Sequence, residues 1–192
     1  MEYEPTPPPT PDEALASLAE AAREKNRARG LYRRFSGSIF VIWGSIYALA
    51  YGAGCFWAAA EAIWLPLVLA GFALSFWLGS RMGSFLRSST GRTFRNLWAA
   101  FGAAYFLLNW GFAGVQTPEY LFSFVINLFI AYALLASAAI TAQPTLFRAS
   151  VVLALIDTLF FSLAPAWYCP AMAALGILAV VTGLGMVRSR AL

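Results

Sequence analysis

The sequence contains no histidine, and only 11% of its residues are charged. Without histidine the chain cannot build a Ser-His-Asp triad, a Cys-His dyad or an HExxH zinc site. Its two cysteines, Cys55 and Cys169, form no CxxC pair and no frame for an iron–sulfur cluster. No glycine-rich phosphate loop follows a strand, because the sequence predicts no strands. We therefore expect a protein that is not an enzyme and that binds no cofactor or metal.

Apolar residues dominate what is present, at 60% of the chain, and from residue 37 about six apolar stretches are long enough to cross a bilayer. The first, third and fifth connections are short, which favours antiparallel neighbours. We therefore predict an all-α polytopic membrane protein, with a six-transmembrane-helix bundle of three hairpins at residues 37–190. The predicted spans are residues 37–56, 63–80, 97–114, 119–141, 146–163 and 167–187.

The 13 basic residues follow an alternating pattern along these spans. The basic residues lie before the first span, between the second and third spans, near the start of the fifth span and after the sixth span. The connections that follow the first, third and fifth spans contain no lysine or arginine. Because lysine and arginine stay on the cytoplasmic side, the pattern predicts a multi-pass protein of the cytoplasmic membrane with both termini cytoplasmic. These residues flank apolar segments and lack interleaved aromatics on a polar face, so the net charge of +4 indicates the anionic lipid bilayer as partner, and no nucleic acid.

Residues 1–36 form a separate cytosolic region, with a proline-rich lead followed by a short basic helix. Thr10 and Glu13 have the spacing of a capping box, Pro11 suits the first helical position, and Gly30 is the expected stop. The helix has a thin apolar stripe, which leaves two interpretations open. It rests on lipid headgroups, or it docks onto a cytosolic or membrane protein partner.

Asp157 is the only charged side chain well inside a predicted span. A carboxylate at this depth must face the bundle interior and be paired or protonated. Counting residues from the outer surface places Asn127 and Tyr105 at about the same depth and Asn109 somewhat closer to that surface. These four residues form a candidate intramembrane polar site. It is either a proton, cation or ligand site or a structural group that holds helices together.

Two further features concern helix pairing. Gly44, Ala48 and Gly52 form a small-residue stripe that allows close helix packing, either within the chain or in a homo-oligomer. Cys55 and Cys169 both fall near the outer surface, on the first and last spans. If those spans are neighbours, a disulfide between the two cysteines is sterically feasible on an oxidising exterior.

The isolated polar residues decide which function the sequence favours. Transporters use broken helices or a polar path at the midplane, and this chain offers neither. We therefore expect a non-catalytic structural or accessory membrane component, whose cytosolic tail contacts a partner. The alternative is a small-solute or ion transporter or channel that uses Asp157 in a polar station. A water-accessible cavity that reaches Asp157 would favour the alternative.

Overall fold

The computed structural model describes residues 10–57, 61–81, 89–112 and 120–188. Within these ranges every regular element is a helix, which confirms the all-α prediction. The helices are α1 (Pro11–Gly54), α2 (Glu61–Ser80), α4 (Ser89–Phe112), α5 (Leu121–Thr141), α6 (Pro144–Leu163), the single 3-10 turn η2 (Pro165–Trp167) and α7 (Tyr168–Arg188).

Most of these helices suit a membrane. In the part of the chain that the structure describes, 5 helical segments are long and apolar enough to span a bilayer, namely α1, α2, α5, α6 and η2 with α7. Helix α4 carries Arg92 and Arg95 in its first two turns, which lowers its mean hydropathy. Its length is nevertheless about 36 Å, enough to cross a hydrocarbon core of about 30 Å. By length and composition, these helices are candidate membrane spans.

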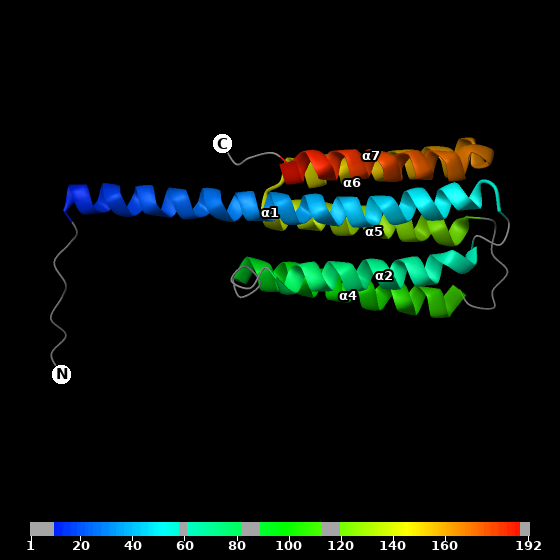
Figure 1. Cartoon of the computed structure of the whole chain (residues 1–192), viewed down its shortest axis with the longest axis horizontal. Helices are drawn as coiled ribbons and strands as arrows, with labels where there is room; N and C mark the ends of the chain where they lie inside the picture. Colours follow the sequence, from blue (N-terminus) through cyan, green and yellow to red (C-terminus); the bar gives the residue numbers. More distant parts are fainter. Residues whose placement is uncertain (1–9, 58–60, 82–88, 113–119, 189–192) are drawn as a thin grey trace.

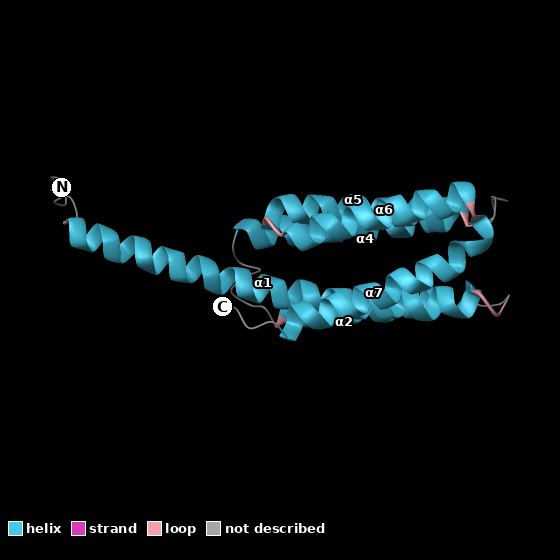
Figure 2. Ribbon diagram, turned by 90° about the horizontal axis from the view of Figure 1, so that it is seen from above, coloured by secondary structure: helices cyan, strands magenta, loops and turns pink. Residues whose placement is uncertain are grey.

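The six long helices run alternately up and down in two layers of three. One layer holds α7, α1 and α2, and the other holds α6, α5 and α4 (Figures 1 and 2). Within each layer the neighbouring helices pack together, most extensively α1 against α7 and α5 against α6. Helices α1 and α5 are therefore the central members of the two layers, and side chains between them lie in the middle of the bundle.

Helix α1 corrects one prediction. The short N-terminal helix that should end near Gly30 is instead the first part of a continuous helix of 44 residues. A glycine inside a helix costs only about 1 kcal/mol relative to alanine, and the strong helix formers around Gly30 offset that cost. The predicted start is correct, since Thr10 and Glu13 form a capping box at the N-terminus of α1.

The N-terminal part of α1, residues 11–34, is called the arm below. Most of its described side chains are exposed, and the first buried positions of α1 are Ser36 and Gly37. The arm continues the direction of α1 beyond the end of the bundle (Figure 1). At the helical rise of 1.5 Å per residue it is about 36 Å long.

Glycines bring α1 and α7 into backbone contact. A Cβ added at Gly44 would lie 2.7 Å from the carbonyl oxygen of Gly176, and one at Gly37 would lie 2.8 Å from that of Gly183. Real Cβ atoms do not come this close, so only glycine allows the approach. Gly52 is different, because a Cβ there would meet nothing within 4 Å. Each step of four residues turns the helix face by about 40°, so Gly52, two such steps after Gly44, faces away from α7.

Candidate functional site

Asp157 lies on α6 and is completely buried between the two layers. Its Oδ1 atom accepts a hydrogen bond from the Tyr168 hydroxyl at 2.6 Å and another from Asn127 Nδ2 at 3.0 Å. Tyr168 stands at the first position of α7 and Asn127 on α5. The carboxyl group therefore connects α6 to a neighbour in its own layer and to a helix in the other layer.

Asn127 is the centre of this polar cluster. Its Oδ1 atom accepts a hydrogen bond from the Tyr47 hydroxyl at 2.5 Å. Its Nδ2 atom lies 3.1 Å from the Tyr51 hydroxyl and 3.0 Å from the Tyr168 hydroxyl, in addition to Asp157. An amide group carries only two hydrogens, so these acceptors share them. Asn127 thus joins the central helix of one layer to the central helix of the other.

Aromatic rings surround the hydroxyl groups of the cluster and hold them in place. The Tyr51 ring meets the Trp64 ring edge to face, with centroids 4.8 Å apart. The Tyr168 ring stacks on Tyr120 at 5.2 Å. Rigid rings with one polar tip suit this position, because the ring stays in the apolar interior and the hydroxyl finds a partner.

The structure places the predicted site residues unequally. It brings Asp157 and Asn127 into direct contact. Tyr105 is buried on α4 in an adjacent apolar cluster with Val68 and Ile126. Asn109 also belongs to α4, but its side chain is outside the part of the molecule that the structure describes.

The sequence analysis missed the three tyrosines that complete the site, Tyr47, Tyr51 and Tyr168. Tyr47 and Tyr51 are one turn apart on α1, at a spacing of four residues. That spacing, at a depth similar to Asp157, is the signal that could have indicated them. Tyr168 stands at the start of the predicted span 167–187, a position typical of aromatic residues at the membrane surface. Its place beside Asp157 depends on how α7 starts, which spacing along the chain does not reveal.

The centre of the site is buried, and Tyr47 at its edge is partly buried. The exposed fractions are 0% for Asp157 and Tyr168 and 1% for Asn127. The second carboxyl oxygen of Asp157, Oδ2, is buried and has no hydrogen-bond partner among the described residues. In the same part of the chain, no three His, Cys, Asp or Glu side chains are grouped so as to hold a metal ion. The arrangement ties α1, α5, α6 and α7 together through hydrogen bonds that lipid cannot replace.

Further polar contacts join helices within each layer. The indole nitrogen of Trp43 donates to Ser75 at 3.1 Å between α1 and α2, and that of Trp98 donates to Ser137 at 3.1 Å between α4 and α5. The Ser150 hydroxyl donates to the Ala131 carbonyl at 2.7 Å between α6 and α5. The Asp157 cluster differs from these pairs because it crosses between the layers.

The cysteines also come together. Cys55 follows the last residue of α1, Cys169 is the second residue of α7, and Cys55 packs against the buried cluster that contains Cys169. Both are free thiols in this structure.

The chain matches no protein-family model, no curated protein and no solved structure.

Proposed function

We propose that the chain is a non-catalytic, multi-pass protein of the cytoplasmic membrane that holds a rigid helical arm in the cytosol for a protein partner. The observation that carries this proposal is the continuity of α1 from the arm into the bundle. The glycine contacts of α1 with α7 and the polar contacts of Tyr47 and Tyr51 anchor its second half. The arm is thereby fixed in direction relative to the membrane domain.

The surface of the arm supports docking to a protein rather than lying on headgroups. A helix in the headgroup layer needs a break between itself and the first span, and α1 has none. Leu15 and Leu18 are 65% and 66% exposed, and with Ala22 they share one face of the helix. An exposed apolar stripe on a projecting helix suits a groove in a partner, with these residues as anchors.

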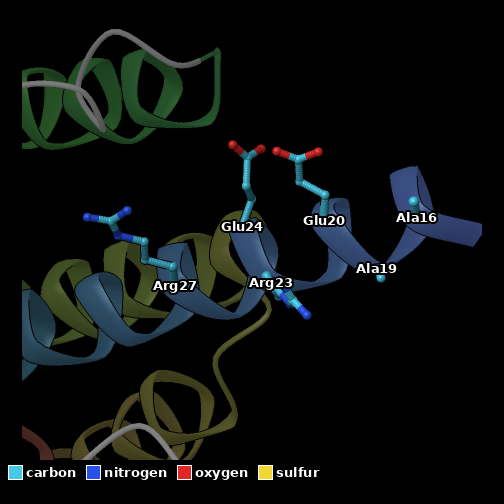
Figure 3. Close-up of a pocket in the computed structure, with 6 residues that line it drawn as sticks. All are labelled: Ala16, Ala19, Glu20, Arg23, Glu24 and Arg27. Carbon is cyan, nitrogen blue, oxygen red and sulfur yellow. The ribbon is translucent and has the colours of Figure 1, made fainter. Parts of the chain in front are cut away.

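The acidic residues Glu20 and Glu24 lie away from that stripe. A shallow hollow runs along the arm beside Glu20, Arg23 and Glu24. Figure 3 shows the carboxylates of Glu20 and Glu24 directed to one side of α1 and Arg23 directed to another. Helix geometry places Glu20 and Glu24 on the face opposite Leu18, so the acidic residues lie away from the apolar stripe.

Photo-crosslinking in living cells tests the docking face. A crosslinking residue at position 18 should give an adduct of one discrete mass. The same residue at position 20 is the matched control, because two helix positions differ by about 200° in direction, and it should give little adduct. With the crosslinking residue kept at position 18, Leu15→Ser should weaken the adduct, and in the chain without a crosslinker the double variant Leu15→Ser/Leu18→Ser should reproduce the phenotype of an arm deletion. Equal crosslinking from both faces, or an arm deletion without effect, would contradict the proposal.

The proposed orientation rests on the basic residues. Arg81 follows α2, Arg92 lies in the first turn of α4, Arg148 lies near the start of α6 and Arg188 ends α7. These helix ends lie at the end of the bundle from which the arm extends (Figure 1). Lysine and arginine stay in the cytoplasm, so this end is cytoplasmic in our proposal. Reporter fusions at Gly91 and Glu61 test it, with a cytosolic signal expected at Gly91 and an exported one at Glu61.

A second candidate function is transport of a proton or small ion, and the observation that favours it is the buried, unpartnered Oδ2 atom of Asp157. Ionisable groups inside membrane proteins commonly mark ion pathways. The complete burial of Asp157 supports the first proposal instead, because a station for transport must open to water. Flux measurements in liposomes separate the two candidates.

A further inference from the structure

The two cysteines are the only ones in the chain, and the fold packs Cys55 against the buried cluster that contains Cys169. The Cys55 thiol donates a hydrogen bond to the Tyr51 carbonyl at 3.2 Å, at the point where α1 ends. A Cβ added at the preceding residue, Gly54, would lie 3.5 Å from the Cys169 sulfur. The contact joins the first and last helices of the bundle, which also pack closely through their glycines.

The residues around the pair place it at the membrane surface. Phe56 and Trp57 follow Cys55 and are 93% and 53% exposed, and Trp167, close before Cys169, is 65% exposed. Large aromatic residues are enriched at the level of the headgroups. Cys55 is partly exposed, whereas Cys169 is buried. A water-soluble reagent can therefore reach Cys55 first.

We propose that Cys55 and Cys169 form an intramolecular disulfide, produced by exchange with the reactive disulfide of an oxidising protein outside the cytoplasm. The inference rests on the proposed orientation, which puts this end of the bundle on the oxidising side, and it is independent of the arm. The Cys55 thiolate attacks one sulfur of the oxidant and releases the other as a thiolate. The Cys169 thiolate then displaces the oxidant from Cys55. The oxidant leaves as a dithiol, with the two electrons and two protons that the cysteines have lost.

The bond would act on the polar cluster as well as on the helix pair. Cys169 belongs to the same buried group as Tyr51, Tyr168 and Met172. A covalent link between the ends of α1 and α7 fixes the two helices whose tyrosines meet Asn127. Reduction should therefore loosen the end of the bundle nearest Asp157.

Thiol counting on the full-length protein tests the proposal. Membranes from oxidase-competent cells are quenched in acid, denatured and treated with a maleimide of high mass, before and after reduction. Wild type should give no adduct before reduction and two afterwards. The single variants Cys55→Ser and Cys169→Ser are the matched controls, and each should give one adduct without reduction. Two adducts on unreduced wild type, or a dimer that runs as a monomer only after reduction, would overturn the proposal.

A separate measurement tests the orientation on which the proposal depends. In the Cys169→Ser variant, a membrane-impermeant maleimide should label Cys55 in cells whose outer layers have been permeabilised and whose cytoplasmic membrane is intact. If Cys55 is labelled from outside and wild type still carries two free thiols, the disulfide proposal fails and the orientation stands. If Cys55 is labelled only after the membrane is broken, the orientation fails, and the disulfide proposal fails with it.

Discussion

Substitution of Asp157 distinguishes a structural polar cluster from an ion-binding site. Asp157→Asn keeps the shape of the side chain and an oxygen that can accept from Tyr168 and Asn127, the two donors to Oδ1. Asp157→Leu removes that oxygen and leaves both donors buried. The two variants therefore differ mainly in whether the hydrogen bonds of the cluster survive.

The expected magnitudes follow from these contacts. Hydrogen bonds between helices in membranes contribute about 0.6 kcal/mol on average. A buried donor that is left without a partner costs about 1–3 kcal/mol. We expect Asp157→Leu to lower the free energy of unfolding by about 1–3 kcal/mol. The loss should be about 1 kcal/mol if the Tyr168 and Asn127 donors find other acceptors. Asp157→Asn should lower it by less than about 1 kcal/mol, since the acceptor remains.

Unfolding by sodium dodecyl sulfate, followed by circular dichroism or tryptophan fluorescence, measures these differences. Leu155→Ala is the control on the same helix, because Leu155 is 65% exposed and faces away from the cluster. It should change the free energy of unfolding by less than about 0.5 kcal/mol. The reasoning would be refuted if Asp157→Leu were as silent as this control, or if Asp157→Asn were as damaging as Asp157→Leu. Loss of a proton flux in Asp157→Asn, with stability unchanged, would instead support transport.

Three smaller predictions concern the ends of the molecule and the α1–α7 contact. Gly176→Leu should disrupt the helix pair and lower the melting temperature in detergent, whereas Gly52→Leu, which meets open space, should leave it unchanged. Hydrogen bonds with the backbone and then the side chain of Thr10 lower the pKa of the Glu13 carboxyl group in the folded protein. The ionised cap therefore stabilises α1 at pH values above the pKa of Glu13 in the unfolded chain, and this stabilisation is lost as the pH falls through the pKa in the folded protein. The Thr10 and Glu13 amide signals in NMR should report fraying of the first turn of α1 in that acidic range, and Thr10→Ala should show it at neutral pH. Deleting residues 1–9, which lie outside the described part of the chain, should leave the melting temperature unchanged.

The helices and part of the site could be predicted from the sequence because both depend on position along the chain. Long apolar runs indicate the spans, and the distance from a span end gives the depth of a residue, which is how Asp157 and Asn127 were matched. Depth alone does not say in which direction a side chain points. Tyr105 has a suitable depth, and its side chain packs with Val68 and Ile126, a contact that depth does not predict. Direction depends on which helices are neighbours, and this is set by tertiary packing.

The continuity of α1 was missed for a different reason. Gly30 carried the local stop signal, but a stop needs more than one permissive residue. The residues after a helix must leave the helical conformation and satisfy its last carbonyl groups. Arg29, Leu31 and Tyr32 all continue the helix, so the glycine is tolerated at a cost of about 1 kcal/mol. The result favours partner docking over the headgroup interpretation of the tail, because a separate helix could rest on the membrane and a continuous one projects from it.

The pairing of α1 with α7 shows what decides helix neighbours in a membrane. Lipid tails are as apolar as leucine, so hydrophobicity does not select one neighbour over another, and close packing of small residues does. Gly37 and Gly44 are seven positions apart on α1, and so are Gly176 and Gly183 on α7. Because the helices are antiparallel, Gly37 meets Gly183 and Gly44 meets Gly176, two turns apart on both sides of the contact. The regular spacing of Gly44, Ala48 and Gly52 within one helix pointed to a stripe of three positions. The equal spacing in two helices is the better guide, because a backbone contact needs a small residue on both sides.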